Sequence, residues 1–206
     1  SDQLRDAIRS QVVADIRALH DPAWRDRGGS PRNAGELREA RNMPSTLLEL
    51  AFHDFAGDAA RLADPAFRHD SARAIYKGIL RFFRGAGATV VPLTPSDLRV
   101  TNLGGGELRV SWNSVNDPLE PSAAATRFKV YLSRDGRGFN NGQIVTGSSM
   151  TLSGYSPGDR VFVRVAGLNA GGEGLATRIG GAQVGSGGAM LVVDGFDRAF
   201  THTNTN

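Results

Sequence analysis

The chain has 206 residues, no cysteine, and 24 Lys and Arg residues against 21 Asp and Glu residues, for a formal net charge of +3. Without cysteine there is neither a disulfide framework nor a thiolate zinc site. The arginines are scattered and form no basic stripe of the kind that nucleic-acid binding needs, and no apolar run approaches the ~20 residues of a membrane-spanning helix.

We predict two domains, because domains usually have about 100–200 residues and the chain changes character near residue 85. Before this point helical periodicity and arginine dominate, and after it come short alternating runs rich in Val, Thr, Ser and Gly. We place an α/β domain at residues 1–85, a β-sandwich at 92–179, and a linker with the start of a further strand or domain at 186–206.

The first predicted element is an amphipathic helix over residues 3–19. Its apolar residues fall on one helical face: Leu4, Ile8, Val12, Ile16 and Leu19. Ser1 or Asp2 is the candidate N-cap, and the helix should end before Asp21-Pro22. Residues 25–35 lack periodicity and predict a surface loop, which a short strand over residues 36–39 follows.

The segment from Met43 to Phe55 places one carboxylate, Glu49, in an otherwise apolar run. A run this short behind Pro44 predicts a buried strand of an α/β domain. Glu49 should then lie near the carboxyl end of that strand, where open α/β sheets place their ligands, and be available for acid/base chemistry. An ion pair between Glu49 and one of the many arginines is the alternative interpretation.

A second helix should begin at Asp64, with Asp64 as cap and Pro65 at the first helical position. Its buried face is marked by Phe67, Ile75, Gly78, Ile79 and Phe82. Residues 1–85 are therefore predicted to be mixed α/β, with only two strands and thus a partial sheet.

Three motifs occur in order along residues 1–83: Asp26-Arg27-Gly28, Met43-Pro44-Ser45-Thr46-Leu47-Leu48-Glu49-Leu50-Ala51-Phe52 and Ala72-Arg73-Ala74-Ile75-Tyr76-Lys77-Gly78-Ile79. With the long N-terminal helix, they resemble the C-terminal half of the zinc-dependent N-acetylmuramoyl-L-alanine amidases, the type 3 amidase family. The chain departs from that pattern at Ala51, where the family has Gly, and at Asp54 and Phe55, where it has a polar residue and Asn.

The resemblance implies a bacterial cell-wall hydrolase that cleaves the amide between N-acetylmuramic acid and L-Ala of peptidoglycan. Glu49 would be its catalytic carboxylate, passing a proton from the attacking water to the leaving amine. Zinc would be the cofactor, with two His and one Glu ligand supplied by upstream sequence outside this chain. Peptidoglycan would be the partner, and the site of action would be secreted, periplasmic or at the cell surface.

The four histidines, His20, His53, His69 and His202, show no spacing typical of a metal site. We therefore predict no metal ligand and no cofactor-binding residue in this chain. His53 lies four residues after Glu49, so in a strand it would share the face of Glu49. A surface position in a strand-to-helix loop is the alternative for His53.

Residues 92–178 alternate in short runs that predict an all-β sandwich. The strands are expected near residues 98–100, 107–112, 127–132 and 161–168, with Trp112 filling the core. This pattern resembles the fibronectin type III domain across nearly ninety residues. Such a sandwich is either a spacer or a ligand platform, and its fold alone does not decide between them. Residues 189–198 then predict a buried strand, which opens a further domain or pairs back onto the first one.

A second function class stays open beside the amidase, namely a non-catalytic wall-binding or scaffold module that lacks the metal site. Glu49 favours the enzyme, because a scaffold has no need of a carboxylate within an apolar strand. The missing metal ligands favour the module for this chain taken by itself. The sequence makes no prediction of the oligomeric state.

Overall fold

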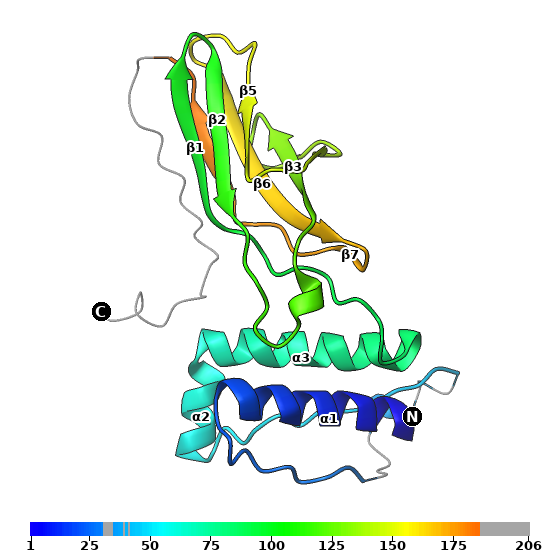
Figure 1. Ribbon diagram of the computed structural model, residues 1–206. Helices are drawn as coiled ribbons and strands as arrows, with labels where there is room; N and C mark the ends of the chain where they lie inside the picture. The colour runs from blue at the N-terminus through cyan, green and yellow to red at the C-terminus, as the bar shows by residue number, and fades with distance from the viewer. Residues whose placement is uncertain (31–34, 39, 41, 186–206) are drawn as a thin grey trace. The chain divides into compact units, whose positions relative to one another are not determined.

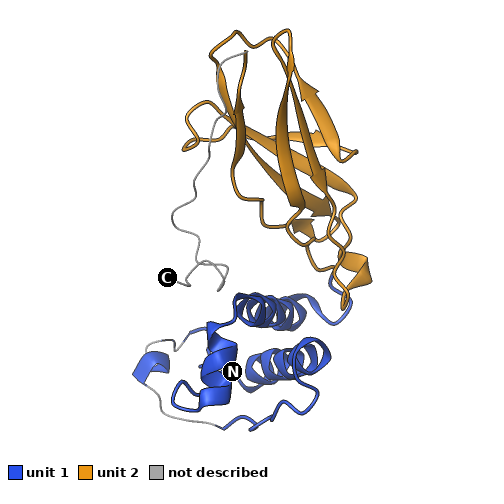
Figure 2. Cartoon of the chain, turned by 90° about the vertical axis from the view of Figure 1, so that its left-hand side faces the viewer, with its two compact units in different colours: residues 1–88, 196–206 blue, residues 89–195 orange. Residues whose placement is uncertain are grey.

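The structure is a computed structural model that describes residues 1–30, 35–38, 40 and 42–185. The chain divides into two compact units, with the boundary between Ala88 and Thr89 (Figure 2). Each unit has its own hydrophobic core. The strand predicted over residues 189–198 lies outside the described residues.

The first unit is built on two long helices that lie side by side and run in opposite directions (Figure 1). Helix α1 covers Asp2–Leu19 and buries residues spaced four apart, namely Leu4, Ile8, Val12 and Ile16. This spacing places them on one face, so the helix predicted over residues 3–19 is confirmed. The buried face packs against Phe67 and Ala74 of the second long helix.

That second helix, α3, covers Pro65–Arg84 and is preceded by the short helix α2, Ala56–Ala63. The Asp64 carboxylate accepts a hydrogen bond of 2.9 Å from the backbone N–H of Ala66, and Pro65 occupies the first helical position. Both features confirm the prediction. An N-cap oxygen accepts from an otherwise unpaired backbone N–H at the start of a helix, and proline has no N–H that would need a partner there. Gly85, with φ of 84°, ends the helix.

A close approach of backbones explains Gly78 of the third motif. A Cβ atom at this position would lie 2.6 Å from the Cα of Ile8 and 3.0 Å from the carbonyl oxygen of Ala7, both backbone atoms of α1. Glycine therefore lets the two helices pack at this point, and a larger residue requires one of them to move.

We expect Gly78→Ala to lower the free energy of unfolding of the helical unit by about 1–3 kcal/mol, the usual cost of overpacking a core. The better helix propensity of alanine, about 1 kcal/mol, offsets only part of the clash. Thermal unfolding followed by circular dichroism measures the change. Gly87→Ala is the matched control, because a Cβ there meets nothing within 4 Å. Equal melting temperatures for the two variants would contradict the close packing.

Lys77 of α3 is buried and forms an ion pair with Asp15 of α1. Its Nζ atom lies 2.6 Å from Asp15 Oδ2, and the two side chains are 1% and 8% exposed. Gln11 donates a second hydrogen bond of 2.7 Å to the other carboxylate oxygen. The pair therefore joins the two long helices at a position that is buried from solvent.

The predicted partial α/β sheet is wrong for the described part of the first unit, which is a three-helix region. Residues 36–39 were expected as a strand, but Gly35–Leu37 form a turn of 3-10 helix. Residues 44–52, the second expected strand, have no regular secondary structure. A strand exists only through hydrogen bonds to a neighbouring strand, and the described residues of this unit offer none.

The second unit is an antiparallel β-sandwich (Figure 1). One sheet has the order β1-β2-β5, formed by Ser96–Gly104, Glu107–Asn113 and Ser149–Leu152. The other has the order β4-β3-β6-β7, with β8 also paired to β6, formed by Gln143–Val145, Arg127–Ser133, Arg160–Asn169, Gly172–Glu173 and Gly180–Gln183. A short 3-10 helix, Pro121–Ala123, precedes β3.

The core of the sandwich comes from alternate residues of β2, β3 and β6. Buried positions recur every second residue, as at Leu108, Val110 and Trp112 of β2. Val161, Val163 and Val165 of β6 continue the pattern from the opposite sheet. The alternation read from the sequence is thus confirmed as the inward-facing side of each strand.

Candidate functional site

Glu49 lies in an extended segment that joins the 3-10 turn to α2, and its side chain is exposed. The burial predicted from its apolar neighbours is wrong, because those neighbours are themselves open to solvent: Leu47 is 50% exposed and Leu48 37%. In the part of the chain that the structure describes, no ion pair joins Glu49 to an arginine. Its carboxylate is therefore available to a substrate or partner.

The segment is held at its end, beyond Glu49. Leu50 packs against the core between the two long helices. The backbone N–H of Phe52 donates a hydrogen bond of 3.0 Å to Asp58, an acidic residue in the first turn of α2. The Phe52 ring also lies under the guanidinium group of Arg27, 4.8 Å from its centroid. These contacts fix the position of the backbone next to Glu49 without covering its side chain.

Arg27 belongs to the Asp26-Arg27-Gly28 motif, so the structure brings two of the three motifs together. Asp26 pairs with Arg9 of α1 at 3.0 Å and accepts a hydrogen bond of 2.8 Å from the backbone N–H of Gly28. Gly28 has φ of 77°, which favours glycine. The loop is thereby anchored to α1 while Arg27 reaches Phe52. Sequence reasoning missed this contact, because a cation–π pair between distant residues leaves no spacing pattern.

The three histidines within the described residues lie apart from one another and belong to no metal-binding group. His20 Nε2 lies 2.8 Å from the carboxylate of Asp70, which ties the end of α1 to α3. His53 and His69 are exposed, so the surface interpretation of His53 is confirmed, and His202 lies outside the described residues. Among the described residues no group of three His, Cys, Asp or Glu side chains is placed to hold a metal ion. These residues therefore do not fit a zinc ion.

We expect the chain of residues 1–206 to bind zinc weakly and without a stoichiometric site. Protein zinc sites need three or four ligands at about 2.0–2.3 Å, and the described residues contain no group of three such side chains. Titration calorimetry with zinc chloride measures the binding. One tight zinc ion per chain would contradict the expectation, and double replacement of His53 and His69 by alanine would then locate it.

Comparison with known proteins shows to which domain family the second unit belongs. Residues 93–179 match the fibronectin type III domain family. This region is a fibronectin type III domain. The fold predicted for it is confirmed, and no amidase domain is detected elsewhere in the chain.

Two solved structures are similar to about half of this chain. The FN5 domain of Drosophila Lar is 23% identical, with a TM-score of 0.36, and the match covers 47% of this chain and all of that one. The sixth fibronectin type III domain of the human fibronectin type III domain containing protein 3 is 18% identical, with a TM-score of 0.41, over 52% of this chain and 100% of that one.

Part of the chain is similar to a curated bacterial protein. The chain is 44% identical over 84 residues to a protein of Bacillus anthracis named as an uncharacterized cell wall amidase. The match takes in 41% of this chain and 14% of the relative, so this chain spans a small part of the relative's length. In the described residues no helix is long and apolar enough to cross a membrane.

Proposed function

We propose that residues 1–85 are the C-terminal half of a zinc-dependent cell-wall amidase domain, which the fibronectin type III domain follows in the same chain. The observation that carries the proposal is the 44% identity over 84 residues to a protein named as a cell wall amidase. The three motifs in residues 1–83 support it. The proposed substrate is the amide between N-acetylmuramic acid and L-Ala of peptidoglycan, and the enzyme acts outside the cytoplasm, secreted, periplasmic or at the cell surface.

The exposed apolar side chains around Glu49 support the same proposal. Large apolar residues along one short extended segment are open to solvent: Met43, Leu47, Leu48, Phe52 and Phe55. Such a concentration usually marks a surface that another part of a protein covers. In the proposed full-length enzyme the upstream zinc-binding half covers it and gives the segment a neighbouring strand, as expected for a buried strand that carries a catalytic residue.

Within this proposal Glu49 acts as general acid and base. Its carboxylate takes a proton from the attacking water and delivers that proton to the nitrogen of the leaving L-Ala. Arg27 contacts the ring of Phe52 and Asp58 accepts from its backbone N–H, so both act as positioning residues for the adjoining segment. Zinc would supply Lewis-acid polarisation of the scissile carbonyl, but the described residues of this chain provide no ligand set for it.

The test is digestion of purified peptidoglycan by the full-length protein in the presence of zinc, with products identified by mass spectrometry. We expect free stem peptides with an L-Ala amino terminus and glycan strands without peptide. If the protein binds peptidoglycan but releases no stem peptide, the amidase proposal is overturned and the chain belongs to a non-catalytic wall-binding module.

A further inference from the structure

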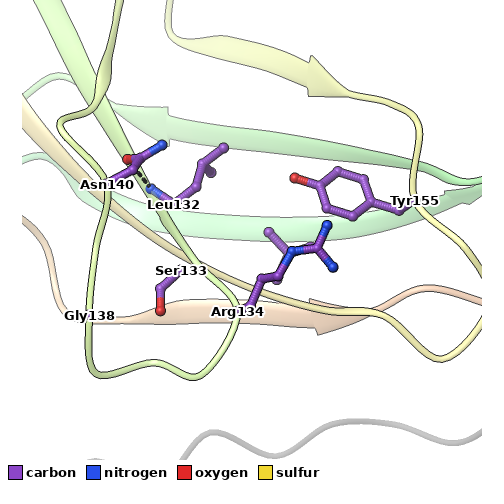
Figure 3. Close-up of a pocket in the computed structure, with 7 residues that line it drawn as sticks. Leu132, Ser133, Arg134, Gly138, Asn140 and Tyr155 are labelled. Carbon is purple, nitrogen blue, oxygen red and sulfur yellow. Dashed lines mark hydrogen bonds between the residues drawn. The ribbon is translucent and has the colours of Figure 1, made fainter.

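The fibronectin type III domain contains a pocket of about 390 Å³ at the end of β3 (Figure 3). Its apolar surface comes from Leu132 of β3 and Val161 of β6. Polar side chains from two separate loops stand around it, namely Arg134 and Asn140 on one loop and Tyr155 on the other. A pocket of this size accommodates a group as large as a dipeptide.

Asn140 is oriented by the backbone of the sandwich. Its side-chain oxygen accepts hydrogen bonds from the backbone N–H groups of Leu132, at 2.9 Å, and Gly142, at 3.1 Å. The backbone N–H of Asn140 donates to the carbonyl oxygen of Leu132 at 3.0 Å. Because two donors fix the position of the oxygen, the side-chain amino group must lie on the other side of the amide. Within the described residues no hydrogen bond uses this amino group.

Tyr155 and Arg134 provide two more hydrogen-bond donors. The backbone N–H of Tyr155 donates to the carbonyl oxygen of Gly106 at 3.2 Å, which anchors the loop. The phenol hydroxyl of Tyr155 has no partner in the described part of the chain. The Arg134 guanidinium lies over the Tyr155 ring, 5.7 Å from its centroid, and forms an exposed ion pair with Asp159 at 3.6 Å, a separation too long for a hydrogen bond.

Ser133 of the pocket lining and the neighbouring Asp135 form hydrogen bonds within their own loop. The buried Ser133 hydroxyl donates to Asp135 and accepts from the backbone N–H of Gly136, both at 2.9 Å. Asp135 also accepts from the backbone N–H groups of Arg137 and Gly138. The bonds from the Arg137 N–H and the Ser133 hydroxyl lower the pKa of Asp135 below its usual value. The polar side chains of the lining that can still donate to a ligand are therefore Asn140, Tyr155 and Arg134, and Arg134 is a cation.

We propose that this pocket binds a carboxylate that carries an adjacent apolar group, such as the C-terminal alanine of a peptide. Asn140, Tyr155 and Arg134 would donate hydrogen bonds to the carboxylate, and Leu132 with Val161 would contact the methyl group. A carboxylate fits because it accepts several hydrogen bonds and donates none. The proposal depends on the proposed function only in naming a stem peptide, as opposed to an acidic sugar, as the source of the carboxylate.

The test is a titration of the chain of residues 1–206, labelled with ¹⁵N, followed by NMR. The probes are N-acetyl-D-alanyl-D-alanine, the same dipeptide with a C-terminal amide, and D-glucuronate. We expect saturable shifts at the pocket residues with the dipeptide acid, and at least about tenfold weaker binding of the amide, because hydrogen bonds to a charged group are stronger than those to a neutral one.

Three variants locate the binding. Asn140→Asp keeps the oxygen that accepts the two backbone hydrogen bonds but replaces the amino donor by a negative charge, so we expect binding weakened by more than about tenfold. Tyr155→Phe removes the hydroxyl only, and Arg134→Gln removes the cation, and each should weaken binding about tenfold. Arg137→Gln, with the same charge change on the same loop but outside the pocket lining, should bind as the unmodified chain does.

The outcomes test the pocket independently of the proposed amidase activity. Absence of saturable binding, equal affinity for acid and amide, or unchanged affinity in the Asn140→Asp variant with an intact spectrum would overturn the carboxylate pocket. Binding of glucuronate in preference to the dipeptide would overturn the stem-peptide assignment. None of these results bears on amide cleavage by the full-length protein, which is measured separately.

Discussion

Glu49→Gln should lower the release of stem peptides by the full-length protein at least about 100-fold, and up to about 10,000-fold, the range that general acid/base catalysis contributes. Glutamine keeps the shape and hydrogen-bonding capacity of the side chain but does not carry a proton between water and the leaving amine. Because Glu49 is exposed and makes no ion pair in the described residues, its replacement should leave the helical unit as stable as before. Product release from purified peptidoglycan gives the rate, and circular dichroism gives the stability.

Glu36→Gln is the matched control for this variant. Glu36 is also an exposed glutamate of the first unit, in the 3-10 turn Gly35–Leu37, and its replacement makes the same change of charge. We expect it to retain the unmodified rate. A Glu49→Gln protein that releases stem peptides at that rate would show that Glu49 is not catalytic, even where the full-length protein proves to be an amidase.

Lys77→Met is expected to destabilise the helical unit by about 3–5 kcal/mol, because it leaves the buried Asp15 carboxylate without its partner. Asp15→Leu should also destabilise the unit, because it removes the carboxylate that pairs with the buried Lys77 ammonium group. In a unit of this size such a loss lowers the melting temperature by more than about 10 °C. Thermal unfolding followed by the helical circular dichroism signal measures both variants.

The double variant, Lys77→Met with Asp15→Leu, distinguishes the contribution of the ion pair to stability from the contribution of the volume that its side chains fill. Apolar side chains of similar volume often replace a buried ion pair at little cost, so we expect the double variant to be far more stable than either single one. Lys129→Met is the control for removing a lysine charge. Lys129 pairs with Glu173 at 3.3 Å on a partly exposed surface, where ion pairs contribute at most about 1 kcal/mol. Additive losses in the double variant would contradict this account of the pair.

The helices and the sandwich were predictable because their patterns are local. The spacing of Leu4, Ile8, Val12 and Ile16 specifies the buried face of α1 whatever lies opposite. Asp64 and Pro65 specify the start of α3 through bonds made within one turn. In the sandwich, the alternation of Leu108, Val110 and Trp112 marks one side of β2, and this pattern is repeated in β6. Each of these patterns involves only residues that are close to one another in the sequence.

The pocket in the sandwich was not predictable from its residues. Arg134, Asn140 and Tyr155 lie on two loops, and nothing in their spacing indicates that they surround one cavity. The turn-forming composition of residues 133–142 indicates a loop there, but the direction of the Asn140 amide comes from the backbone of Leu132 and Gly142. The pocket is therefore a product of how β3 and its loops fold together.

By itself the sequence determined the helices α1 and α3, the fibronectin type III domain and the identity of the candidate residue Glu49. It did not determine the conformation around Glu49, nor that Lys77 would be buried against Asp15. An α-helix closes its hydrogen bonds within its own segment, so its sequence suffices. A strand takes its hydrogen bonds from another segment, and a buried charge takes its partner from another element. The same apolar run that predicts a strand therefore remains an extended, exposed segment wherever the described fold supplies no neighbour.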